Sequence, residues 1–209
     1  MAVTVSNPKL EAVNVMLSVI GEAPVNSLRS GLADAEAAER ILDRVNKEVQ
    51  TEGWHFNTRR KYTLTPDADS KMVVLPSNTL KVVCVDTSRD FPLVQRGYRL
   101  YNFEKATYEI KDDYDEVKVD LVEELDFNVD QDEKNALPEY ARRYISIRSS
   151  RVFVSRYLGS AEIYGFSERD EAMSRSEMKQ AEALIGRHNI FDHYKRGESH
   201  LYESYNRLI

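Results

Sequence analysis

The sequence is poor in cysteine, tryptophan, proline and glycine. Its 209 residues include one Cys, one Trp, six Pro and eight Gly. The single Cys84 excludes a disulfide within the chain and argues against a cysteine-based zinc site. Its place in the run VVCV predicts a small buried side chain. So few cysteines are typical of a protein assembled in a reducing cytoplasm.

Long apolar runs and catalytic motifs are also missing. No stretch approaches the roughly 18 apolar residues of a membrane span, and the N-terminus lacks the pattern of a signal peptide. We therefore expect a soluble protein made in the cytosol, without membrane insertion. The sequence contains no glycine-rich phosphate loop, nucleophile elbow or HExxH motif, so we expect no cofactor and no catalysis. His188 and His193 have no carboxylate or Cys spaced to complete a metal site, so we expect no metal.

The net charge is −6, whereas proteins that bind DNA through its phosphates are usually basic. Carboxylates are concentrated between residues 112 and 126, and a pair of them would suit a glycan hydrolase. Nothing in the sequence selects such a pair, and charge runs are usually solvated surfaces. The acidic residues of this segment are Asp112, Asp113, Asp115, Glu116, Asp120, Glu123, Glu124 and Asp126.

Apolar spacing predicts two helices at the N-terminus, over residues 8–20 and 33–52. Asn7 is placed to cap the first helix, and Pro8 suits its first turn. Gly21 and Gly53 are placed to end the two helices. Beyond Gly53, we expect Trp54 and Phe56 to anchor the second helix end into the core.

Residues 61–125 change to short β-type runs separated by Asp, Pro, Gly and Ser. The runs are KYTLTP, KMVVLP, LKVVCVD, PLVQ, YRLYN, ATYEI and VKVDLVEEL. PLVQ and YRLYN flank Arg96-Gly97, which predicts a hairpin turn. Residues 126–135 are polar and acidic, as in a linker.

Two further helices are predicted after the linker, one from Pro138 to Gly159 and one over residues 161–185. For the last helix we expect the apolar residues to face inward: Phe166, Met173, Ala181, Leu184 and Ile185. The sequence thus predicts an α+β fold, in which two N-terminal and two C-terminal helices form a bundle and an antiparallel β module is inserted. The predicted parts are a helical pair over 1–58, the β module over 59–130, a second pair over 131–186 and an extended tail over 187–209.

The third predicted helix is rich in arginine. These side chains suit either DNA phosphates or carboxylates of a neighbouring subunit, and the acidic excess of the chain favours carboxylates. We predict a subunit interface in which Arg148 and Arg151 meet the acidic segment of a neighbour. The candidate residues are Arg142, Arg143, Arg148, Arg151 and Arg156 on one side, with Asp112, Asp113, Asp115, Glu116, Glu123 and Glu124 on the other.

Two segments resemble the tail tubular protein A family of short-tailed phages. In the first, a helix ends in Ile20-Gly21-Glu22, with Pro24 and Val25 following, and a second alanine-rich helix runs into Gly53-Trp54-His55-Phe56-Asn57. The second is the Pro-led helix LPEYARRYISIRSSRVFVSRYLG. The β region and the C-terminal tail are less similar to the family.

The resemblance implies a structural virion protein of the phage tail, assembled in the host cytoplasm. Family members form a ring of about twelve subunits between the portal and the nozzle protein, called tail tubular protein B. Tail fibres dock on the ring, and DNA passes through it non-specifically. We also expect the tyrosine-rich tail to contact the portal or a neighbouring subunit, since Tyr favours interfaces. Its candidate residues are Phe191, Tyr194, Tyr202 and Tyr205.

Overall fold

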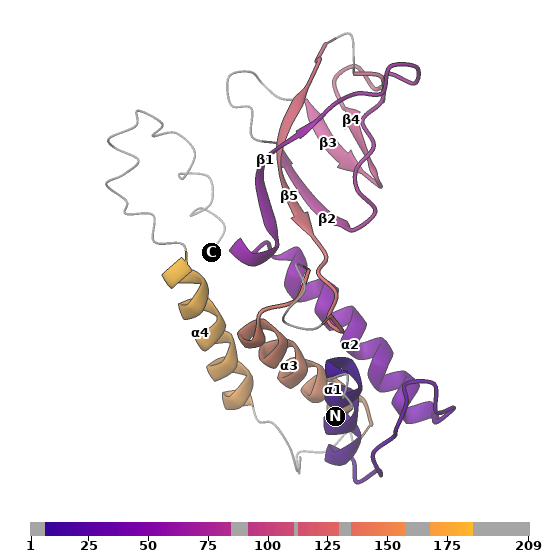
Figure 1. Cartoon of the computed structure of the whole chain (residues 1–209), viewed down its shortest axis with the longest axis vertical. Coiled ribbons are helices and arrows are strands. Elements are labelled where there is room, and N and C mark those ends of the chain that lie inside the picture. Colours follow the sequence, from indigo (N-terminus) through magenta and orange to yellow (C-terminus); the bar gives the residue numbers. More distant parts are fainter. Residues whose placement is uncertain (1–6, 85–91, 111–112, 130–134, 158–167, 186–209) are drawn as a thin grey trace, which may run out of the picture.

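A pair of helices, a series of strands and a second pair of helices follow one another in the predicted order and give an α+β fold. The computed structural model describes residues 7–84, 92–110, 113–129, 135–157 and 168–185. In chain order the elements are α1 (Pro8–Val19), α2 (Ala33–Thr51), the 3-10 turn η1 (His55–Asn57), β1 (Thr58–Leu64), β2 (Thr79–Cys84), β3 (Leu93–Arg96), β4 (Arg99–Asn102), β5 (Val117–Glu123), α3 (Glu139–Tyr157) and α4 (Glu168–Ile185). The helices gather at one end of the molecule and the strands at the other, and α2 runs from the first end towards the second (Figure 1).

The helical body, α1 to α4, begins with the predicted cap. The Asn7 carboxamide accepts a hydrogen bond of 2.9 Å from the backbone N–H of Leu10, which satisfies a donor of the first turn. α1 ends at Val19, and Gly21 just beyond it has a φ of +81°, in the left-handed region that favours glycine. Both signals were correctly read from the sequence.

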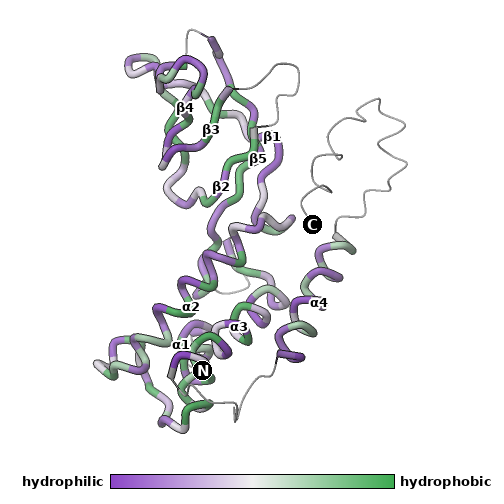
Figure 2. The backbone as a smooth tube through the Cα atoms, turned by 180° about the vertical axis from the view of Figure 1, so that it is seen from behind, coloured by the Kyte–Doolittle hydropathy of each residue, from purple (hydrophilic) through white to green (hydrophobic). Residues whose placement is uncertain are grey.

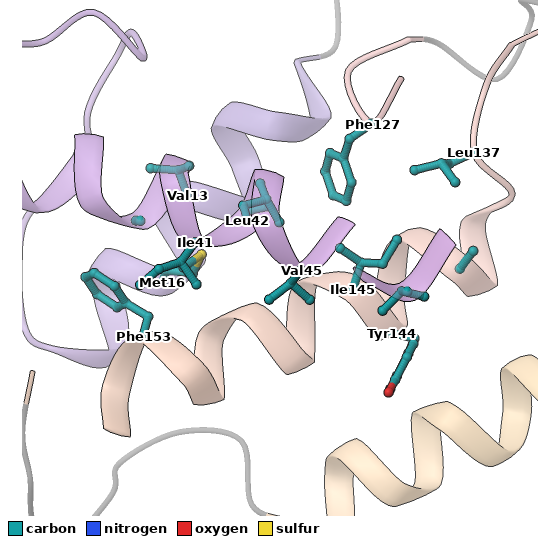
Figure 3. Packing of buried hydrophobic residues seen from close by; sticks show 14 of the residues in the cluster. Val13, Met16, Ile41, Leu42, Val45, Phe127, Leu137, Tyr144, Ile145 and Phe153 are labelled. Atoms are coloured by element: carbon teal, nitrogen blue, oxygen red, sulfur yellow. The ribbon is translucent and has the colours of Figure 1, made fainter. Parts of the chain in front are cut away.

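The core of the helical body lies between α1, α2 and α3. Phe153 of α3 lies beside Met16 of α1 and Ile41 of α2 (Figure 3). Leu42 and Tyr144 are also fully buried. Each large apolar side chain buried in this way contributes roughly 1.5–3 kcal/mol, so the three helices form a stable base. α4 packs on α3 and touches η1.

The β module is built around the central strand β5, which pairs antiparallel with β1 on one side and β2 on the other. The hairpin β3–β4 forms a second, two-stranded sheet. Its turn residues are Gly97 and Tyr98, one position later than predicted, and Gly97 has a φ of +63°. A second core lies inside the module, so hydrophobic segments occur at both ends of the molecule (Figure 2). It consists of Leu64, Val73, Leu75, Leu93, Leu100, Ile110, Val117, Val119 and Leu121.

Two of the predicted strands do not form. Residues 71–76 and 106–110 contribute only the isolated bridges of Val74 with Arg99 and of Thr107 with Asn102. Lys71 and Ala106, at the start of these segments, have φ values of +57° and +52°. Left-handed backbone interrupts an extended chain, so these segments run as loops against the hairpin.

The junction between α2 and β1 is close-packed, which explains its glycine. Gly53 has a φ of +86°, and a Cβ at this position would lie 3.3 Å from Cγ2 of Val122 in β5. The indole N–H of Trp54 donates to the carbonyl of Val49, at 2.7 Å, and so caps the last turn of α2. The chain therefore turns from helix into strand directly against β5.

Side-chain amides fasten the same junction, which we call the neck: Gln50, Trp54, Asn57, Glu123 and Leu125. The Gln50 amide pairs with the backbone of Leu125, donating at 2.9 Å and accepting at 2.8 Å. The Asn57 amide donates to the carbonyls of Gln50 and Glu123 at 2.9 and 3.0 Å. The backbone N–H of Trp54 donates to the Asn57 carboxamide oxygen at 2.8 Å. Because Gln50 and Asn57 are buried, these bonds fix the β module relative to the helical body.

Candidate assembly surfaces

Four of the five predicted arginines form ion pairs within the chain. The pairs are Arg142–Glu139 at 3.5 Å, Arg143–Glu177 at 3.1 Å, Arg148 with Glu48 and with Glu171 at 3.1 Å, and Arg151 with Glu171 and with Glu168 at 3.2 Å. Arg148 and Arg151 are three residues apart on α3, so both reach the Glu171 carboxylate. Arg143, Arg148 and Arg151 thereby join α3 to α4, and Arg148 also joins α3 to α2. Whether any of them also meets the acidic segment of a neighbour stays a prediction.

The inward face of α4 is mostly polar, so the prediction that Met173 and Leu184 face inward was wrong. Met173 and Leu184 are 60% and 62% exposed, whereas Ser174, Met178 and Glu182 are buried. The three buried residues follow at four-residue steps and form one helix face. α3 offers arginines and tyrosine hydroxyls to α4, and these favour a polar partner over an apolar one. Of the other predicted residues, Ala181 is half-buried, while Phe166 and the side chain of Ile185 lie outside what the structure describes.

Glu182 fastens the end of α4 to the rest of the helical body. Its carboxylate accepts from the Tyr140 hydroxyl at 2.7 Å and from the backbone N–H of His55 at 2.6 Å. Nδ1 of His55 lies 3.2 Å from the same carboxylate. Burial, and then the hydrogen bond to the Glu182 carboxylate, raise the pKa of Tyr140 above its ordinary value.

Tyr140→Phe should cost about 1 kcal/mol of the free energy of unfolding at neutral pH, because Glu182 loses a donor. The raised pKa of Tyr140 also makes the free energy of unfolding depend on pH. Below the unfolded tyrosine pKa of about 10, Tyr140 is protonated in both states and the contribution is complete. Above it the unfolded state ionises first, so stability falls as the pH rises. Urea titrations between neutral pH and about pH 11 should show the gap between wild type and Tyr140→Phe narrowing; a constant gap would contradict this role of Tyr140.

The described carboxylates of the acidic segment lie along and beside β5. Four of them pair with basic side chains: Asp113 with Lys105, Glu116 with Lys118 at 3.2 Å, Glu123 with Arg59 at 2.9 Å and Glu124 with Lys47 at 3.5 Å. Asp115 is exposed, and Asp112 lies outside the described residues. These contacts give the carboxylates structural partners and select no pair for glycan hydrolysis.

The outer face of the β3–β4 hairpin carries exposed aromatic and aliphatic side chains. Leu93 and Leu100 point into the second core, while Val94 is 41% exposed on the other side. Tyr98 in the turn and Phe103 after β4 are 56% and 55% exposed. The sequence reading missed this face, although alternation along YRLYN indicated that one side of the hairpin faces solvent.

Arginine and tyrosine complete the hairpin face. Tyr101 packs edge-to-face against Tyr108, with ring centres 4.9 Å apart. The Arg96 guanidinium lies 3.9 Å from the Tyr101 ring centre. Exposed Tyr, Phe and Arg are the side chains in which protein interfaces are enriched.

Arg156, the fifth predicted arginine, lies elsewhere. It lines a surface hollow of about 350 Å³ between the end of α3 and α2, together with Ala37, Arg40, Ile41 and Arg44. The signal for Arg40 and Arg44 was their four-residue spacing on the charged face of α2, to which the sequence reading assigned no role.

Three remaining predictions concern the tail, the membrane and metals. The candidate portal contacts Phe191, Tyr194, Tyr202 and Tyr205, and also His188 and His193, lie outside the described residues. In the described part of the chain, no helix has the length and apolar character needed to cross a membrane. The same residues contain no group of three or more His, Cys, Asp or Glu placed to hold a metal ion.

Residues 10–188 match the sequence model of a family described as tail tubular protein. The chain belongs to the tail tubular protein family. The comparison with curated proteins found no match. Family membership makes the protein a structural component of the phage virion tail, and it covers both the helical body and the β module.

The residues that carried the sequence resemblance now have structural roles within this tail tubular protein. Gly21 lies just beyond the end of α1, Gly53 lets the chain turn from α2 into the neck, and Trp54 and Asn57 belong to the neck. Phe56 packs against the core of the helical body and against Tyr140, with ring centres 6.2 Å apart. The motif therefore determines how the two ends of a tail subunit are joined.

Proposed function

We propose that this protein is the non-enzymatic adaptor that joins the portal to the tail nozzle of a short-tailed phage. About twelve subunits form a closed ring, and viral DNA passes through its centre. The observation that carries the proposal is the family match over residues 10–188. The net charge of −6 per subunit supports a channel that does not hold DNA, because a negative lumen repels phosphates.

The shape of the subunit supports separate roles for the helical body and the β module. The helical body supplies the ring, and the β module projects from it (Figure 1). The neck keeps the module at a fixed position, so its hairpin face is presented in the same direction by every subunit. Val94, Tyr98 and Phe103 make this face the docking surface for the nozzle protein, tail tubular protein B, or for tail fibres.

The test is the mass of the purified protein, alone and mixed with portal protein, by light scattering and negative-stain imaging. Rings of about twelve subunits, formed alone or on the portal, are expected. Phe103→Ser should leave the ring mass unchanged and weaken binding of the nozzle or fibre protein. A chain that stays monomeric in every mixture would overturn the adaptor function, and unchanged binding by Phe103→Ser would exclude the hairpin face.

A further inference from the structure

The hollow on α2 and α3 concentrates positive charge in an acidic protein. Arg40 and Arg44 are one turn apart on α2, and Arg156 reaches the hollow from the last turn of α3. Arg44 and Arg156 have no acidic partner among the described residues, and Arg40 has only the exposed Glu36 at 3.8 Å. By contrast, the other α3 arginines pair within the chain. The hollow therefore contains guanidinium groups that can pair with carboxylates or other anions of a binding partner.

The lining of the hollow is partly apolar, since it includes the half-buried Ala37 and the edge of the buried Ile41. Apolar side chains contribute nothing to the binding of a free anion or a phosphate. A protein surface that presents an apolar side chain between carboxylates would match both the apolar and the charged parts.

α1 presents a surface of that kind. Its inward residues Val13 and Met16 are fully buried, while Glu11 and Val15 are exposed one turn apart on the opposite side. Val15 is the one large apolar side chain of α1 that is exposed, at 41%. Glu22, in the turn after α1, is exposed as well, and neither glutamate has an ion-pair partner in the described part of the chain. The outward face of α1 thus offers the apolar Val15 with the carboxylate of Glu11 one turn before it, and the carboxylate of Glu22 follows the C-terminal end of the helix.

The two surfaces face different directions. Lys9 of α1 pairs with Glu39 and Asp43 of α2, at 2.8 and 2.9 Å. At 100° per residue, Arg40 and Arg44 project about 100° around α2 from these two positions. Val15 is exposed whereas Val13 and Met16 of the same helix are buried, so the outward face of α1 is available to a second copy of the chain.

We propose that the outward face of α1 (Glu11, Val15, Glu22) docks into the hollow (Arg40, Arg44, Arg156) of the next copy of this chain. Such a head-to-tail contact uses two different faces, which is the type of interface that closes into rings. The contact deepens the proposed function and rests on it, because it names the surfaces through which adaptor subunits associate. The excess of carboxylates in each copy favours this occupant over nucleic acid.

A mixing experiment with two double variants tests the pairing. Arg40→Glu with Arg44→Glu makes the hollow acidic, and Glu11→Lys with Glu22→Lys makes the α1 face basic. Each variant alone brings like charges together, so association should require at least about tenfold more protein than for wild type. In an equimolar mixture every contact has opposite charges again, so association should return in complexes that contain both variants. Light scattering and native mass spectrometry of all three samples give the result.

Matched controls carry the same charge changes elsewhere. Arg169→Glu with Lys179→Glu, on the exposed side of α4, and Glu104→Lys with Glu109→Lys, in the β module, should associate like wild type. If wild type associates and the two test variants also do so alone, the pairing is wrong while the adaptor function stands. If wild type stays monomeric and instead binds duplex DNA through Arg40 and Arg44, both proposals are overturned.

Discussion

Replacing Asn57 with aspartate should destabilise the protein more than a substitution of similar side-chain volume at any other neck residue. The substitution keeps the shape of the side chain but removes its N–H donors, which now bond the carbonyls of Gln50 and Glu123. A buried carboxylate would face two carbonyl oxygens without a donor between them. We expect a loss of about 3 kcal/mol or more in the free energy of unfolding at neutral pH.

Two comparisons separate this effect from a general cost of added charge. Asn78→Asp, at an exposed position, should change stability by less than about 0.5 kcal/mol. Burial favours the protonated carboxyl, which donates one hydrogen bond. The deficit of Asn57→Asp should therefore shrink as the pH falls towards about 4. Urea titrations at both pH values give the numbers. Equal stabilities for the two variants would show that the neck does not depend on the Asn57 donors.

Local signals in the sequence were sufficient for most of the fold. Asn7, Gly21 and Gly53 determine helix ends through their own backbone and side-chain chemistry, so those ends were predictable. The hairpin was predictable from Gly97, although its turn lies one residue further along. The contacts of the neck were not, because Gln50 meets the backbone of Leu125, which is 75 residues away in the chain.

The prediction failed for α4 because it assumed that apolar residues face inward. That assumption holds for a helix packed on an apolar surface, but α4 packs on the arginines and tyrosine hydroxyls of α3. The correct prediction requires knowing which side chains α3 presents to α4, and the sequence pattern of α4 alone does not contain that information. The same limit applies to the hollow: Arg40 and Arg44 look like solvated charges until Arg156 of α3 is placed beside them.

Glu171→Gln should release α4 from the helical body. The Glu171 side chain is 18% exposed, and its carboxylate accepts from both Arg148 and Arg151. Glutamine keeps the size of the side chain but loses the charge, and its amide N–H groups cannot accept from a guanidinium. The remaining amide oxygen is neutral and serves one guanidinium, so one hydrogen bond is lost and the other is weakened, which together should cost about 2 kcal/mol. Hydrogen exchange of the α4 amides should then accelerate about thirtyfold, with little change in α2.

Glu168→Gln is the matched control for this prediction. Glu168 also pairs with Arg151, at 3.2 Å, but its side chain is 91% exposed. Its removal should cost less than about 0.5 kcal/mol, because exposed ion pairs contribute little. Salt should accelerate exchange in wild-type α4 more than in Glu171→Gln, which has already lost the central carboxylate. If both variants exchange like wild type at low salt, the ion pairs contribute little to the stability of α4. Apolar packing of Met178, which is fully buried in the same interface, then holds the helix in place.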